Sequence, residues 1–221
     1  MSEPIPLRDR LRALPTFPRP GLPGLDVGAA PATPHELFTT WLDDAIDAGV
    51  LAPHAVVLST ADAAGNVRAR TVILKDVTSD GWWFASRSSG PKGRDLEANP
   101  HAAMTFLWPV LGRQVRVTGT VSVADPATSR ADFLARPDLS RAAGLVNRQS
   151  EPLGSLAEYD AAFAAALDAV TADPGLVAPD WTAFALAPTE VEFWQASDEG
   201  PHVRLLYRQG DTDWTTGLLW P

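Results

Sequence analysis

Basic and amide side chains stand out in a stretch of the sequence that otherwise reads as half-buried strands. Arg70 and Lys75 lie in the run RTVILK and, being five positions apart, point to opposite faces if the strand is regular. The segment SRSSGPKG, residues 86–93, leads from a strand into a helix start. Such a turn presents free N–H groups and hydroxyls to an anion, and Lys92 adds a point charge. The segment predicts an anion-binding loop, and taken alone it also fits an ordinary solvated loop.

Other kinds of site are not indicated. The sequence has no GxGxxG after a strand, no GxxxxGK[ST] loop, no GxSxG elbow and no HExxH motif. Its four histidines, His35, His54, His101 and His202, lie far apart without an acidic partner at ligand spacing, so no metal site is expected. The absence of cysteine excludes disulfides and thiol chemistry.

Charge and composition narrow the partners. The 221 residues carry a formal net charge of −9, which argues against nucleic acid, so an anionic ligand must be held by a local basic cluster. No apolar run approaches the length of a membrane span, and the first residues lack the apolar core of a secretory signal. We expect a cytoplasmic protein with a small-molecule substrate and no membrane or nucleic-acid partner.

The elements that must position these residues are mainly strands. Residues 1–33 are rich in Pro and Gly and predict an irregular or mobile arm, and Thr33-Pro34-His35-Glu36 predicts a capped helix to about residue 48. Strands are expected at 55–60, 67–75, 82–86, 102–108 and 114–123, with a short helix at 92–98. Five strands joined mostly by short turns favour an antiparallel barrel over a parallel sheet.

The second half begins with helices and then returns to strands. Helices are expected at 126–135, 141–147 and 155–170, and strands at 182–186, 190–195, 203–208 and 214–219. The predicted fold class is therefore mainly β with helices: a β-barrel plus α, with a Greek-key-like antiparallel barrel flanked by helices. Residues 34–221 are expected to form a single domain after the arm, 1–33.

Three groups of motifs agree in order with one known family. The first runs from ARTVILKDV through SRSSGPKGRDLEANP to WPVLGRQVRVTG, the second is RQSEPL at 148–153, and the third runs from APDWTAFALAPTEVEFWQ through HVRLLYR to LLWP. Together they resemble the pyridoxamine 5'-phosphate oxidases from about residue 34 to 221. The resemblance implies an FMN-binding split β-barrel that works as a homodimer with its sites at the interface, the region from about 175 to 221 contributing to dimerisation and to the active site.

The resemblance also implies site residues. The FMN contacts would be Arg70, Thr71, Val72, Ile73, Leu74, Lys75, Ser86, Lys92, Gln114, Gln149, Ser150, Trp194 and Arg204. The substrate would be held by Lys75, Arg136, Ser140 and His202, with His202 as the catalytic residue beside the substrate ring. The implied reaction is hydride transfer from a substrate carbon bearing nitrogen or oxygen to flavin N5, with O₂ as acceptor.

Three positions depart from the family pattern. Pro91 replaces an arginine that binds phosphate, Asp132 replaces a tyrosine of the substrate phosphate site, and Gly200 replaces an arginine over the substrate ring. Three functions therefore stay open: a pyridoxamine or pyridoxine 5'-phosphate oxidase, an FMN- or deazaflavin-dependent oxidoreductase of the same fold acting on a different small molecule, or a non-catalytic flavin- or pyridoxal-phosphate-binding protein.

Overall fold

The fold was obtained as a computed structural model that describes residues 5–17, 21–198 and 200–221. It divides into two compact units. One, here called the cavity unit, consists of His54–Thr105 and Arg116–Val191. The other, here called the terminal unit, consists of Met1–Pro53, Phe106–Val115 and Glu192–Pro221. The expectation of a single domain at 34–221 stays a prediction, and the two units are described separately.

Eight antiparallel strands make one sheet whose first six members close into a barrel. The strands are β1 (Ala55–Ala61), β2 (Val67–Thr78), β3 (Gly81–Arg87), β4 (His101–Trp108), β5 (Arg113–Val123), β6 (Trp181–Gln195), β7 (Val203–Gln209) and β8 (Trp214–Leu218). Their order is β3-β2-β1-β4-β5-β6-β7-β8, and an additional pairing of β3 with β6 closes the ring. The predicted split β-barrel is confirmed.

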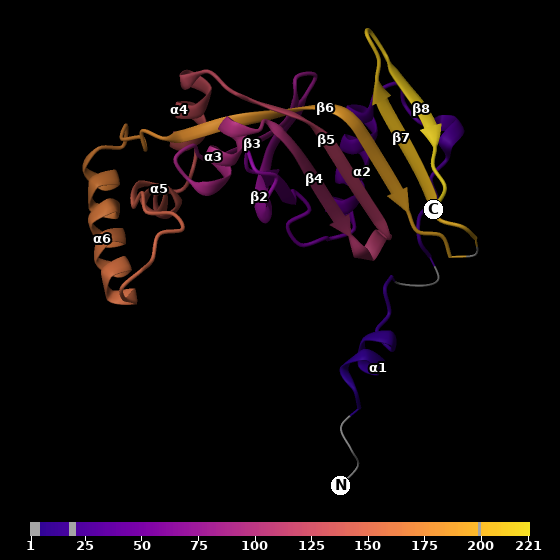
Figure 1. The fold of residues 1–221 in the computed structure, drawn as a ribbon, viewed down its shortest axis with the longest axis horizontal. Coiled ribbons are helices and arrows are strands. Elements are labelled where there is room, and N and C mark those ends of the chain that lie inside the picture. The colour runs from indigo at the N-terminus through magenta and orange to yellow at the C-terminus, as the bar shows by residue number, and fades with distance from the viewer. Residues whose placement is uncertain (1–4, 18–20, 199) are drawn as a thin grey trace. The chain divides into compact units, whose positions relative to one another are not determined.

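The cavity unit holds β1 to β3 complete, together with most of β4, β5 and β6. Its helices are α3 (Pro91–Ala98), α4 (Pro126–Leu134), α5 (Asp138–Leu145) and α6 (Leu156–Ala172), and α5 packs beside α6 (Figure 1). The core contains Trp82, Leu58 and Met104, all fully buried, and the stacked rings of Phe84 and Phe184 at 5.2 Å between centroids. These contacts fix β3 against β6 and so hold the barrel closed.

The terminal unit contains helix α2 (Pro34–Asp47) and the β7–β8 hairpin (Figure 1). The predicted capping box is present, because the Glu36 N–H donates to Thr33 Oγ1 and the Thr33 N–H donates to Glu36 Oε2. Trp41 of α2 packs edge-on against Phe193 at 5.1 Å. Short helical turns also occur before α2 at α1 (Leu7–Arg12) and η1 (Val27–Ala29), and a further one, η2 (Pro109–Leu111), joins β4 to β5.

Several predicted boundaries were wrong. The arm at 1–33 is not wholly irregular, since it contains α1 and η1, while residues 1–4 and 18–20 lie outside the described part. The expected break in β6 around Pro188 does not occur, because the strand runs on through this proline, a residue that lacks an N–H to donate. The second of the three predicted helices begins earlier, at Asp138, and ends at Leu145. Strand β2 continues to Thr78 instead of ending at Lys75.

No helix within the described residues is long and apolar enough to span a bilayer.

Candidate functional site

A cavity of about 890 Å³ lies within the cavity unit, lined by strands β2 and β3, the helices α3 to α6, the loop before α6 and the first residue of β6. It brings together most of the predicted cofactor residues: Arg70, Thr71, Val72, Ile73, Lys75, Ser86, Lys92 and Gln149. Two predicted substrate residues, Arg136 and Ser140, line the same cavity. Leu74 and Ser150 are not part of its lining, and Leu74 is instead a buried core residue.

The first end of the cavity, here called the Lys92 end, is built where β3 turns into α3. Lys92 is only 7% exposed, and its Nζ donates hydrogen bonds to Ser86 Oγ at 2.7 Å and to Gln149 Oε1 at 3.0 Å. Burial lowers the pKa of this ammonium, and the nearby cations Arg70 and Arg87 lower it further. Among the described residues no carboxylate lies within ion-pair distance of Lys92.

The local backbone makes this end possible. Helix α3 starts at Pro91, which suits the first helical position because its missing N–H is not needed there. A Cβ on Gly93 would lie 2.1 Å from the carbonyl oxygen of Ser88, so only glycine allows the turn to pass this close. The result is a cation with neutral partners at a helix N-terminus, which fits the phosphate of FMN.

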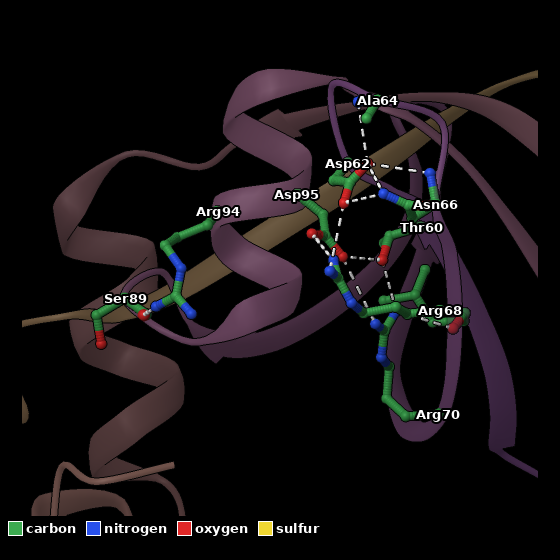
Figure 2. Close-up of polar contacts among 10 residues, drawn as sticks. Thr60, Asp62, Ala64, Asn66, Arg68, Arg70, Ser89, Arg94 and Asp95 are labelled. Atoms are coloured by element: carbon green, nitrogen blue, oxygen red, sulfur yellow. Dashed lines mark hydrogen bonds and ion pairs between the residues drawn. The ribbon is translucent and has the colours of Figure 1, made fainter. Parts of the chain in front are cut away.

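Arg70, the second cation of this end, is held by a network that Figure 2 shows. Its Nη1 donates to the Leu58 carbonyl at 3.1 Å and to Thr60 Oγ1 at 2.8 Å. Asp95 of α3, 3% exposed, accepts from Thr60 Oγ1 at 2.8 Å and from Arg68 Nη1 at 2.5 Å, and lies 3.8 Å from Arg70 Nη2. Asp95 was missed from the sequence, where its only signal is an acid on the buried side of a short helix.

A third cation, which is buried, fixes the loop that supplies Gln149. Arg87, 5% exposed, forms an ion pair with Asp180 and donates hydrogen bonds to the Gly144 carbonyl and to Asn147 Oδ1. It therefore ties the end of β3 to the start of β6 and to the segment after α5. Arg87 was also missed from the sequence, because its partners lie 57 to 93 residues further along the chain.

A second group of lining residues, here called the Arg136 end, begins at an irregularity in β2. Leu74 pairs with Phe84 and Asp76 with Trp83, so Lys75 is the extra residue of a β-bulge and the strand is not regular there. The Lys75 ammonium lies 3.1 Å from Asp132 Oδ1, and Trp181 Nε1 donates to Asp132 Oδ2 at 2.8 Å. Asp132 is a position where the chain departs from the family pattern. It thus pairs with Lys75, one of the residues predicted to bind the substrate.

Arg136 lies on the same wall without a polar partner. Its guanidinium carbon is 4.0 Å from the ring centroid of Trp181, and it makes no hydrogen bond or ion pair with any residue that the structure describes. Burial lowers the pKa of this guanidinium, and the negative charge of Asp132 partly opposes the shift. A Cβ on Gly144 would come within 2.9 Å of Arg136 Nη1, so the missing side chain makes room for the arginine.

The remaining predicted residues belong to the terminal unit. The rings of Trp194 and His202 are 4.8 Å apart, and His202 Nδ1 accepts a hydrogen bond from the Ser197 N–H at 3.2 Å. Arg204 pairs with the buried Glu192 at 2.8 and 3.1 Å. Gln114 lies half-buried in β5. The roles expected for these four residues stay predictions.

Metal ligation has no support in the described ranges, where no cluster of three or more His, Asp or Glu side chains could hold an ion.

Sequence comparison matches residues 42–221 to one family. Residues 42–195 match the model described as pyridoxamine 5'-phosphate oxidase, and residues 181–221 match the C-terminal dimerisation region of pyridoxine 5'-phosphate oxidase, which supports a homodimer. A pyridoxine/pyridoxamine 5'-phosphate oxidase from Rhodococcus jostii is 38% identical over 186 residues, covering 84% of this chain and 83% of the relative. One from Alteromonas mediterranea is 37% identical over 192 residues, covering 86% and 90%.

Solved structures agree with this assignment. PhzG from Burkholderia lata, solved with tetrahydrophenazine-1-carboxylic acid, has a TM-score of 0.83 and 27% identity over 90% of this chain and 99% of its own. A pyridoxamine 5'-phosphate oxidase-related, FMN-binding protein from Nostoc punctiforme shares the fold, with a TM-score of 0.70 and 18% identity over 86% of this chain and 98% of its own. The chain therefore belongs to the pyridoxamine 5'-phosphate oxidase family of FMN-dependent oxidoreductases.

Proposed function

We propose that this protein binds FMN in the cavity of about 890 Å³ and oxidises a small molecule there. The observation that carries the proposal is the Lys92 end. A buried ammonium with only neutral partners, next to Arg70, is costly to keep charged unless an anion joins it. The phosphate of FMN supplies that charge, together with oxygens that accept several hydrogen bonds.

Within the proposal, the chain's residues bind and orient. Lys92, Ser86, Gln149 and Arg70 hold the phosphate end, and residues 71–73 of β2 line the path toward Lys75. Bound FMN would supply a two-electron acceptor that takes hydride at N5 from a substrate carbon bearing nitrogen or oxygen, with O₂ as final acceptor. Lys75, Arg136 and Ser140 would hold the substrate's charged group at the other end.

The substrate has two candidates. The names of the relatives and the presence of Lys75, Arg136 and Ser140 in one cavity favour pyridoxine or pyridoxamine 5'-phosphate. The Lys75–Asp132 ion pair favours a different small molecule, because an acid in this position repels a phosphate. The ligand in the PhzG structure, a carboxylic acid without phosphate, is an example of such a molecule.

Absorption spectroscopy of the purified protein tests this proposal. We expect the protein to take up FMN stoichiometrically and to show the visible bands of bound flavin. Under anaerobic conditions, pyridoxamine 5'-phosphate, pyridoxine 5'-phosphate and tetrahydrophenazine-1-carboxylic acid are then added separately. Loss of the visible absorption of the bound flavin identifies a substrate, and binding of FMN without bleaching by any of the three would favour a non-catalytic flavoprotein.

The proposal includes a homodimer with two sites at its interface and a cytoplasmic location. The match of residues 181–221 to a dimerisation region supports the first, and the large exposure of Trp220, 92%, provides apolar surface for a partner to cover. Light scattering after size exclusion should give twice the mass of 23.6 kDa. His202→Asn then tests the predicted catalytic role, with a loss in the rate of flavin bleaching but not in FMN affinity as the expected result.

A further inference from the structure

We propose that the Arg136 end of the cavity selects a substrate carrying a single carboxylate and rejects a phosphate dianion. The inference rests on the proposed function in taking this end as the place of the substrate. It concerns the substrate class, which neither the fold nor the family assignment decides.

The first observation that supports this selectivity is the balance of charge around the cavity. Six cations line it, and four of them form ion pairs: Arg70 with Asp95, Arg87 with Asp180, Arg148 with Glu151 and Glu158, and Lys75 with Asp132. At the Arg136 end, Lys75 and Arg136 contribute two positive charges and Asp132 one negative charge, which leaves a single positive charge. A carboxylate balances that charge, whereas a phosphate monoester carries about −1.5 to −2 at neutral pH.

The second observation is that Asp132 is held in place by two contacts. Asp132 uses one oxygen for the Lys75 ammonium, 3.1 Å away, and the other for Trp181 Nε1 at 2.8 Å. Its side chain is 17% exposed. A phosphate can reach Lys75 in two ways. Either Asp132 gives up its contacts with Lys75 and Trp181, or the phosphate binds beside the Asp132 carboxylate. Each alternative costs binding free energy.

The third observation is the planar shape of the Arg136 guanidinium and its lack of an acceptor among the described residues. Its guanidinium lies over the Trp181 ring, which restricts the plane of the fork, and it has no acceptor among the described residues. A planar guanidinium matches the two oxygens of a carboxylate in a bidentate pair. The one cation at this end that lacks an acid is thus also the one whose geometry suits a carboxylate.

Calorimetric titration with a matched pair of probes tests the inference. The FMN-saturated protein is titrated with 2-naphthoate and with 2-naphthyl phosphate, which share a ring system and differ in the anion. We expect the naphthoate to bind at least about tenfold more tightly, the size of one charged hydrogen bond gained or lost. Tighter binding of the phosphate to the unmodified protein would overturn the inference.

Two substitutions test whether the charge of Asp132 causes the difference in affinity between the two probes. Asp132→Asn keeps the side-chain shape and removes the charge, so the phosphate probe should gain about tenfold or more while the naphthoate changes much less. Asp76→Asn is the matched control, because Asp76 is adjacent to Lys75 on β2 but does not line this cavity. An equal gain in Asp76→Asn would assign the effect to net charge and refute the role of Asp132.

Arg136→Lys provides a third variant in case the first one folds poorly. It keeps the positive charge and removes the planar fork, so naphthoate affinity should fall by about tenfold with little change for the phosphate. Equal losses for both probes would contradict bidentate recognition. If FMN itself fails to bind, the proposed function fails, but the same probe ratio can be measured on the flavin-free protein, so the two failures are distinguishable.

Discussion

The two ends of the cavity contain the same types of charged residue in different arrangements. Each includes an arginine, a lysine and an acid: Arg70, Lys92 and Asp95 at the first end, and Arg136, Lys75 and Asp132 at the second. Asp95 is 3% exposed, binds Arg68 and Thr60, and does not line the cavity. Asp132 lines the cavity and pairs with its lysine.

This difference shows how the position of an acid decides what a basic site accepts. An acid that lies behind an arginine, outside the cavity, leaves the neighbouring lysine to the ligand, as at the Lys92 end. An acid inside the cavity neutralises the lysine and lowers the charge that the ligand must carry, as at the Arg136 end. The ends are therefore suited to a phosphate and to a weaker anion, respectively.

Removing the lysine of the first end should have the largest effect. Lys92→Met should weaken FMN binding by about 100-fold, because a buried charge-assisted contact to phosphate is lost. The melting temperature of the flavin-free protein should not fall, since burial disfavours the charged ammonium. Quenching of FMN fluorescence measures the affinity, and Arg94→Met, an exposed cation on the same helix, is the control. A comparable loss in Arg94→Met would indicate general electrostatic attraction instead.

Removing the acid behind Arg70 should affect stability more than binding. Asp95→Asn keeps a partner for Thr60 but loses the ion pair with Arg68, whose side chain is 46% exposed, so the free energy of unfolding should drop by about 1–2 kcal/mol. FMN affinity should stay within about threefold, because Leu58 and Thr60 still hold Arg70. Urea unfolding and FMN titration together measure this. A large loss of affinity at unchanged stability would mean that Asp95 orients Arg70 for the ligand.

Filling the space beside Arg136 should act on the second end alone. In Gly144→Ala the new Cβ would lie 2.9 Å from Arg136 Nη1 and 2.9 Å from the Phe133 ring, so the guanidinium must move. Binding of a carboxylate probe should weaken by about fivefold, while FMN affinity should not change. The same calorimetric titration checks both, and parallel losses at the two ends would show that they are not independent.

The smallest expected effect is a change of FMN affinity with pH. The pKa of Lys92 is lowered by burial and by Arg70 and Arg87, so it loses its proton below the ordinary lysine value of about 10.4. An anion favours the protonated form, hence FMN affinity should fall by a few-fold as the pH rises through this lowered pKa. Titrations from pH 7 to about 10 should show this decline in the unmodified protein, and Lys92→Met should give a flat profile.

The barrel and the proximity of Ser86 to Lys92 were predictable because their signals are local. Alternating strands with turn residues, and Ser86 with Lys92 on either side of a glycine turn, lie close together in the sequence. The partners of Arg87 and Lys75 were not predictable, since Asp180 and Asp132 lie 93 and 57 residues away and only the fold brings them together. The bulge at Lys75 also leaves no sequence signal, because it depends on the register with β3.

The pairing of β3 with β6 has a consequence for how the protein forms in the cell. In a growing chain β3 is made well before β6, and 93 residues separate Arg87 from Asp180 at their junction. Contacts this distant in sequence close slowly, and an unpaired strand edge invites association with other chains in the meantime. Newly made protein should therefore depend on rapid completion of the barrel, which closes only when β6 pairs with β3.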